Sequence, residues 1–259
     1  MRNMTSKLLL ALCTLLAVPA FAATAGPHLD PVKVDLRNTE SLQRGAQTFV
    51  NYCLSCHGAV AMRYNRLQDI GLNEEQIKAN LMFTTDKVGD PMKVAMAAQD
   101  GKQWFGATPP DLSTIARSRG ADYLYNYLRG FYRDDSRPTG WNNRVFDKVG
   151  MPNVLWEMQG EQVAVYEKVK NHTTGKEEEV LTGLKLVKPG MLSTTNDKGE
   201  LVNTEFDERI TDLVNYMVFM SEPVKVKNEQ IGYFVLLFLL FVLVPISYLL
   251  KKEYWKDVH

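Results

Sequence analysis

The chain has little cysteine, few histidines and no excess of either charge. Of its three cysteines, Cys13 lies in an N-terminal segment that we expect to be removed, so Cys53 and Cys56 are the thiols that remain. Two cysteines are too few for the common structural zinc site, which takes four sulfur or imidazole ligands, usually from two such pairs. The 30 basic residues balance the 30 acidic ones, whereas nucleic-acid-binding domains usually carry a basic excess. We therefore expect neither a zinc ribbon nor a nucleic-acid-binding protein.

Long hydrophobic runs are also scarce, and the two that are present lie at the ends of the chain. Arg2 and Lys7 flank the start of an apolar run at 8–18, and Ala20-Phe21-Ala22 follows with the small-x-small pattern of a secretory cleavage site. The run is shorter than the roughly 20 apolar residues that cross a bilayer, which leaves a first transmembrane helix as the weaker alternative. We expect residues 1–22 to be a cleaved signal peptide.

The second run, residues 231–250, holds twenty residues without a charge. It is long enough to span a membrane as a helix, and a buried core helix is the alternative. Lys251, Lys252 and Lys256 follow the run while Lys225 and Lys227 precede it, a modest bias toward a cytoplasmic C-terminus. We expect an exported domain at 23–228, an anchor at 229–250 that crosses the membrane once, and a cytoplasmic tail at 251–259.

Both remaining cysteines belong to one motif, "CLSCH", with His57 directly after Cys56. On a helical turn, positions i and i+3 place two thiols on one side, where they can add to the two vinyl groups of a porphyrin, and position i+4 directs the imidazole to the iron. Covalent attachment of one c-type haem uses all three residues. A thiol-disulfide motif and a structural disulfide remain alternatives, but neither requires the histidine. The preceding segment has helical spacing, with Leu42, Ala46, Phe49 and Val50 near one face, and we expect this face to pack against the haem edge.

His57 would leave one axial position on the iron, and its occupant separates electron transfer from catalysis. His28 lies close to the expected mature N-terminus and His172 lies in a polar segment, so both are expected to be solvated, and His259 ends the cytoplasmic tail. Most methionines fall in apolar or helical patterns where core packing is expected; these are Met62, Met82, Met92, Met96, Met158, Met217 and Met220.

Met151 differs from these methionines because it lies between Gly150 and Pro152. Glycine allows close backbone approach, and proline favours an extended conformation in the residue before it, so this loop suits a thioether ligand. Met191 follows a glycine but precedes no proline, and it is the second choice.

The chain resembles the cytochrome c1 family, the haem subunits of bacterial quinol–cytochrome c oxidoreductase (bc1) complexes. The matching segments are "RGAQTFVNYCLSCHG", "RYNRL", "PPDLSTIARSRGADYLYNYLRGFY", "GMP" and "DLVNYMVFMSEP", which runs into the single C-terminal span. The resemblance implies a mainly α fold, with a class I cytochrome c-like haem domain that carries insertions, plus one transmembrane helix.

The resemblance also implies residue roles and partners. Cys53 and Cys56 would hold the haem, His57 and Met151 would ligate its iron, and Arg119 and Tyr123 would lie near the propionates. The implied electron donor is a Rieske iron-sulfur protein, the acceptor is a soluble or membrane-bound cytochrome c, and cytochrome b is a further partner. The chain would not be an enzyme alone, because the quinol chemistry belongs to the complex.

Two features depart from the family, and two other functions stay open. The Met151 loop lacks a second proline found in many members, and residues 160–205 are rich in charge and turn signals, which predicts a solvated, hairpin-like insertion. A free-standing, tail-anchored cytochrome c would share every local feature. A haem enzyme such as a peroxidase would need an open or labile sixth position on the iron.

Overall fold

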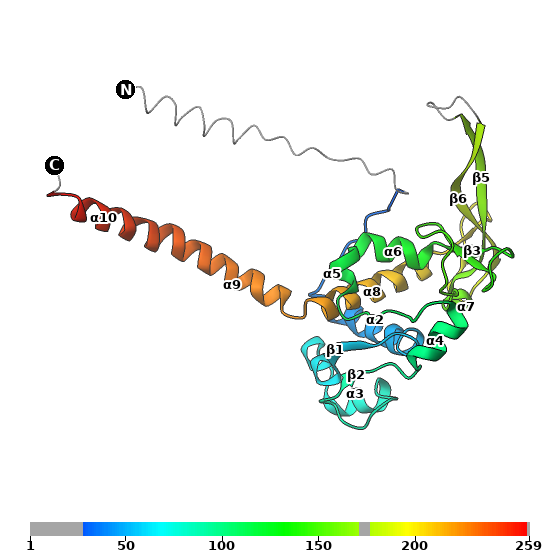
Figure 1. Ribbon diagram of the computed structural model, residues 1–259, viewed down its shortest axis with the longest axis horizontal. Coiled ribbons are helices and arrows are strands. Elements are labelled where there is room, and N and C mark those ends of the chain that lie inside the picture. The colour runs from blue at the N-terminus through cyan, green and yellow to red at the C-terminus, as the bar shows by residue number, and fades with distance from the viewer. Residues whose placement is uncertain (1–27, 171–176, 258–259) are drawn as a thin grey trace.

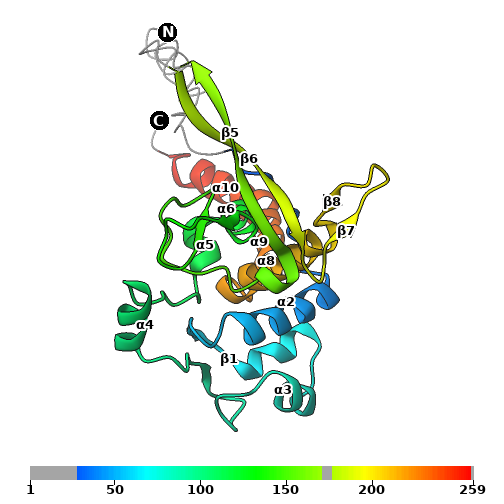
Figure 2. The same cartoon turned by 90° about the vertical axis from the view of Figure 1, so that its right-hand side faces the viewer.

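The computed structural model describes residues 28–170 and 177–257. Within them, a compact head carries a long C-terminal helix on one side and a long β-hairpin on another (Figure 1). After a turn of 90°, the hairpin rises above the head and helix α4 stands at the opposite margin from strands β7 and β8 (Figure 2). Helices supply most of the regular structure, so the expectation of a mainly α chain is confirmed.

Four helices form the core of the head: α2 (Thr39–Tyr52), α5 (Ile115–Arg119), α6 (Ala121–Arg129) and α8 (Thr204–Ser221). Helix α8 packs against the other three. The apolar face expected on α2 is present, since Leu42, Ala46, Phe49 and Val50 are all buried. Its partner was expected to be the haem edge, and this is wrong. The face packs against α8, with the Phe49 and Tyr216 rings 5.6 Å apart, and none of the four residues lines the cavity described below.

Shorter elements surround this core. They are β1 (Ala59–Arg63), the 3₁₀ helix η1 (Tyr64–Ile70), α3 (Glu74–Asn80), β2 (Pro91–Met92), α4 (Ala98–Phe105), β3 (Phe131–Arg133), β4 (Trp141–Asn143) and α7 (Trp156–Gln159). Strand β1 pairs antiparallel with β2, and β3 pairs antiparallel with β4. Six methionines that were expected in the core are buried there: Met62, Met82, Met92, Met158, Met217 and Met220. Met96 is half-buried.

A hairpin is present where the turn signals predicted one. Strands β5 (Gly160–Lys170) and β6 (Glu177–Pro189) pair antiparallel along their length, and the shorter strands β7 (Thr194–Thr195) and β8 (Leu201–Val202) follow. The distal half of β5 and β6 is mostly exposed, as expected for a solvated hairpin.

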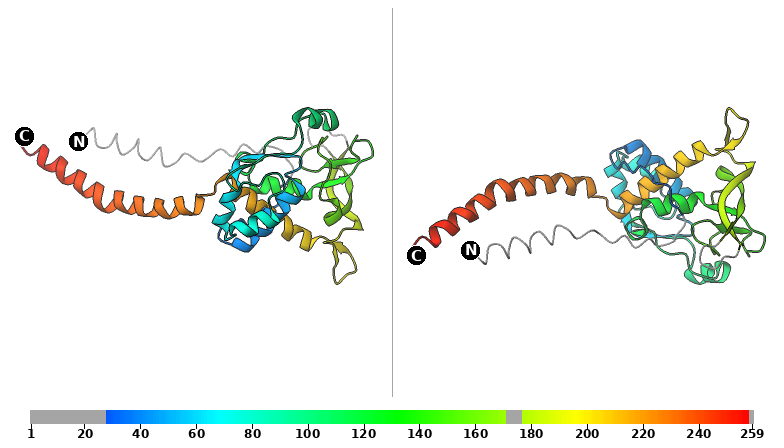
Figure 3. Two further views of the ribbon diagram at one scale, coloured as in Figure 1. Left: turned by 90° about the horizontal axis from the view of Figure 1, so that it is seen from below. Right: turned by 90° about the horizontal axis from the view of Figure 1, so that it is seen from above.

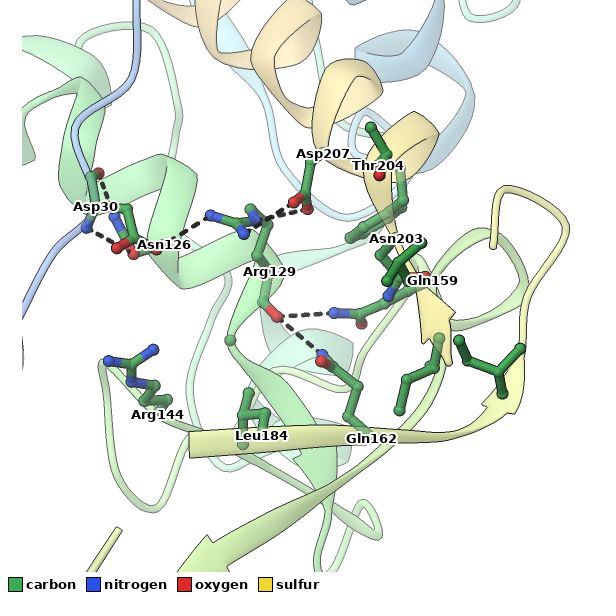
Figure 4. Close-up of a pocket in the computed structure, with 15 residues that line it drawn as sticks. Asp30, Asn126, Arg129, Arg144, Gln159, Gln162, Leu184, Asn203, Thr204 and Asp207 are labelled. Carbon is green, nitrogen blue, oxygen red and sulfur yellow. Dashed lines mark hydrogen bonds and ion pairs between the residues drawn. The ribbon is translucent and has the colours of Figure 1, made fainter. Parts of the chain in front are cut away.

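The base of the hairpin is tied to the head through Arg129, at the end of α6 (Figure 4). The guanidinium makes a bidentate pair with Asp207 of α8, at 2.6 and 2.9 Å, and lies 3.4 Å from Asp30. The Arg129 carbonyl accepts hydrogen bonds from the side-chain amides of Gln159 and Gln162, at 2.8 and 3.0 Å. One residue thus joins the N-terminal segment, α6, α8 and the first hairpin strand.

The C-terminal helix is continuous from Lys225 to Tyr254. It comprises α9 (Lys225–Phe238), a π-helical turn η2 (Leu239–Leu243) and α10 (Val244–Tyr254), and it projects from the head as a gently curved rod (Figure 3). Pro245 has no N–H for the i−4 bond, which accounts for the wider turn just before it. The most apolar 18 residues have a mean hydropathy of 2.6 and none is buried. The alternative of a buried core helix is therefore wrong.

Candidate haem site

The cysteine motif forms one helical turn that continues α2. The Cys56 and His57 amides both donate to the Cys53 carbonyl, at 3.1 and 2.8 Å. This is the i, i+3, i+4 arrangement expected from the spacing. Neither thiol is in a disulfide. Burial raises the pKa of the Cys53 thiol to about 12, so its surroundings favour a neutral sulfur such as that of a thioether.

Next to this turn lies a cavity of about 370 Å³ with a mainly apolar lining. Its volume falls in the range of ligand and cofactor sites. All six site residues expected from the sequence border it: Cys53, Cys56, His57, Arg119, Tyr123 and Met151. They come from the turn after α2, from α5 and α6, and from the loop after β4. Packing therefore brings together residues that are up to 98 positions apart in the chain.

The orientation of His57 is fixed by a hydrogen bond from its Nδ1 to the Pro110 carbonyl, at 2.7 Å. Because a carbonyl can only accept, Nδ1 carries the proton and the Nε2 lone pair is free to bind a metal. Burial lowers the pKa of His57, against the opposing influence of this bond and of Asp111. The imidazole therefore stays neutral, which is the form that ligates iron.

Asp111 holds the segment after the motif in place, a role that the sequence analysis did not assign. One carboxylate oxygen accepts from the Val60 amide and the other from the Ser113 amide, both at 2.9 Å. The Leu112 amide donates to the Gly58 carbonyl at 2.8 Å. The Pro110 carbonyl is thereby held against the imidazole, and we name these contacts of Asp111 the Asp111 clamp. The sequence "PPDLS" could have indicated this role, since Asp-x-Ser favours a turn closed by the aspartate side chain.

Met151 lies in the loop between Gly150 and Pro152 and packs against a small cluster of Phe131, Trp141 and Val149. Its sulfur lies 3.6 Å from the Tyr127 hydroxyl. A Cβ on Gly150 would stand 2.8 Å from the Phe105 carbonyl oxygen, so the close approach expected of this glycine is real.

The rival ligands lie elsewhere. Met191 is 68% exposed and does not border the cavity, because its amide is tied to the Glu157 carbonyl beside the hairpin base. His28 is exposed and pairs with Asp30 at 3.7 Å. His172 lies outside the described residues.

Arg119 and Tyr123 form the rim of the cavity. The Arg119 guanidinium lies 5.5 Å from the centre of the Tyr123 ring, and that ring stacks on Tyr127 at 6.0 Å. Arg119 is exposed, and within the described ranges 28–170 and 177–257 no ion pair with it appears. Its charge is available to an anionic group at the rim.

The donor set of the cavity fits a c-type haem. It offers two free thiols on one turn, an imidazole with its Nε2 free, and a thioether in the same apolar cavity. A lone CxxCH could serve thiol-disulfide exchange, but that reaction needs neither the oriented imidazole nor Met151.

Comparisons with known proteins agree with this reading. The model of the Cytochrome C1 family matches residues 34–258. A protein named cytochrome c1 from Allochromatium vinosum is 46% identical over 255 residues, covering 98% of this chain and 99% of that protein. A protein named ammonia monooxygenase gamma subunit, from Nitrosomonas europaea, is also 46% identical, over 96% of this chain and 97% of its own length. Cytochrome c1 of Rhodospirillum rubrum is 28% identical over 84% of this chain and 81% of that protein. On this match, which spans nearly the whole sequence, the chain belongs to the cytochrome c1 family.

Proposed function

We propose that this chain is the membrane-anchored haem subunit of a bc1 complex, in which it carries single electrons from a Rieske iron-sulfur protein to a cytochrome c. The observation that carries the proposal is the cavity that gathers the CxxCH turn, the Pro110-bound imidazole and the Met151 thioether. Family membership supports the same function.

One haem would be held covalently by Cys53 and Cys56, with His57 Nε2 and Met151 Sδ as the axial ligands. When bound, it supplies a one-electron iron couple. The Pro110 carbonyl keeps the imidazole in the tautomer that ligates. With both His57 and Met151 bound to the iron, no place would be left for a substrate on the metal, which would suit a carrier and not a peroxidase. We infer that the domain is a class I cytochrome c-like fold with the hairpin as an insertion.

The remaining residues of the cavity set the conditions for electron transfer. The apolar lining excludes water and, with methionine ligation, favours a high potential. The Arg119 guanidinium at the rim can pair with a haem propionate, because its planar fork matches a carboxylate. Tyr123 holds that guanidinium over its ring and would lie beside the same propionate.

We assign the topology from the ends of the chain. A cleaved signal at 1–22, which lies outside the described residues, would export the domain at 23–228. The helix at 225–254 includes the anchor at 229–250, and the tail at 251–259 would face the cytoplasm. The haem domain would therefore stand in the periplasm beside the inner membrane, with cytochrome b as its neighbour in the complex. A relative named cytochrome b/c1 supports that association.

Purification from membranes tests the proposal. The tagged, full-length protein is extracted in mild detergent, the proteins that come with it are identified, and quinol-dependent reduction of cytochrome c is assayed in the same fraction. Cytochrome b and a Rieske protein together with that activity are the expected result. A lone haem protein without the activity would favour a free-standing cytochrome. Monooxygenase subunits in place of cytochrome b would favour the other name found among the relatives.

A further inference from the structure

A hydroxyl group lies beside the sulfur of Met151. Tyr127, on the cavity side of α6, places its Oη 3.6 Å from Met151 Sδ, which is within hydrogen-bond range for sulfur. Both residues pack against the same cluster of Phe131, Trp141 and Val149. The contact therefore belongs to a packed part of the cavity wall, in which both residues are half-buried.

The phenol is a donor and its ring is held in place. A phenol is protonated at neutral pH, so the Tyr127 hydroxyl can donate to the Met151 sulfur 3.6 Å away. The ring stacks on Tyr123 at 6.0 Å and meets Phe131 edge-on at 5.4 Å. These contacts fix the direction of the hydroxyl. Within the part of the chain that the structure describes, the Met151 sulfur is the partner found for it.

A thioether has two lone pairs and accepts hydrogen bonds weakly. If one lone pair binds iron, the other can accept from a phenol. We propose that Tyr127 is a positioning residue that donates to the second lone pair of Met151, orients the thioether and raises the reduction potential of the iron. This inference rests on the proposed function, because it takes Met151 as the axial ligand.

The sign follows from electron donation. A hydrogen bond to the sulfur withdraws density from it and makes it a poorer donor. The ferric ion carries the higher charge and loses more by this than the ferrous ion does. Reduction is therefore favoured while the hydrogen bond is present, and removal of the hydroxyl lowers the potential.

The test is Tyr127→Phe in the full-length holoprotein, which removes one oxygen and keeps the stacked ring. Tyr125→Phe is the matched control, because Tyr125 lies on the same helix, loses the same atom and does not border the cavity. Met151→Leu is measured alongside. Each variant is purified with its haem, and the midpoint potential is measured by redox titration together with the red absorption band of methionine-ligated ferric haem.

We expect Tyr127→Phe to keep covalent haem and to shift the band, while the reduction equilibrium constant falls about threefold to tenfold, the size of one modest hydrogen bond. At 59 mV per tenfold for a one-electron couple, this is about 28 to 59 mV. Tyr125→Phe should match the wild type. The inference is overturned if Tyr127→Phe keeps the wild-type potential and band while Met151→Leu changes both. If Met151→Leu changes neither, Met151 is not the ligand, and the assignment within the proposed function fails with the inference.

Discussion

Gly45 lies at the crossing of α2 and α8, and we expect its replacement by alanine to destabilise the core. A Cβ at this position would lie 2.7 Å from Cβ of Tyr216 and closer still to the carbonyl oxygen of Asp212. Ordinary contacts begin near 3.4 Å, so the contact with Tyr216 alone must lengthen by 0.7 Å. Gly45→Ala therefore forces the two helices apart at the centre of the core.

Two effects oppose each other in this substitution. Alanine is favoured over glycine in a helix interior by about 0.5–1 kcal/mol. Overpacking a core costs about 1–3 kcal/mol and occasionally more, and a gap of about 0.5–1 Å forfeits a quarter to a half of each dispersion contact along the seam. We expect a net loss of about 2–3 kcal/mol, because the clash involves backbone that cannot rotate away. For a domain of this size, that corresponds to a fall of about 4 to 12 °C in the unfolding midpoint.

The assay is thermal unfolding of the detergent-solubilised holoprotein, followed by circular dichroism and by the haem absorbance. Gln47→Ala is the control, since Gln47 is exposed on the same helix, and such a substitution should stay within about 0.5 kcal/mol of the wild type. Because α2 leads directly into the turn that carries Cys53, the alanine at 45 should also lower the yield of covalently bound haem. A Gly45→Ala protein as stable as the wild type would refute the close helix crossing.

Three further outcomes are expected. Met151→Ala should keep covalent haem, lower the potential and let imidazole bind the ferric iron; an unchanged spectrum in a titration with imidazole would contradict the ligand assignment. Asp111→Ala removes both oxygens that hold the segment around His57, and should cost about 1–2 kcal/mol in urea unfolding; a loss no larger than that of Asp111→Asn, which keeps one oxygen, would argue against the clamp. Arg129→Met breaks the partly buried pair with Asp207 and should cost about 1–3 kcal/mol at pH 7. Desolvation raises the pKa of Asp207, and Arg129 opposes this rise, so without Arg129 the pKa of Asp207 rises further. Protonation of Asp207 then relieves the unpaired charge, and the loss of unfolding free energy relative to wild type should shrink as the pH falls toward 5. A loss that stays constant with pH would count against this reasoning.

Met151 was predicted as a residue of the haem site from its two neighbours in the sequence alone. Gly150 and Pro152 beside it distinguished it from the other methionines. In the structure Met151 borders the cavity, whereas Met191 is exposed and lies outside it. The α2 face shows the limit. Its helical spacing was evident, but the partner assigned to it was wrong, because periodicity marks which residues are buried and not which element covers them.

The sequence by itself determined the features that depend on neighbouring residues or on length. The CxxCH turn follows from the spacing of three residues, the long C-terminal helix follows from an uncharged run, and the hairpin follows from turn signals between β-branched segments. Tertiary structure decided everything that joins distant parts of the chain: the Pro110 carbonyl on the His57 imidazole, the Asp111 clamp, and the Tyr127 hydroxyl on the Met151 sulfur. The physical reason is that a hydrogen-bond partner is chosen by packing, since each buried donor or acceptor pairs with whichever group the core places beside it.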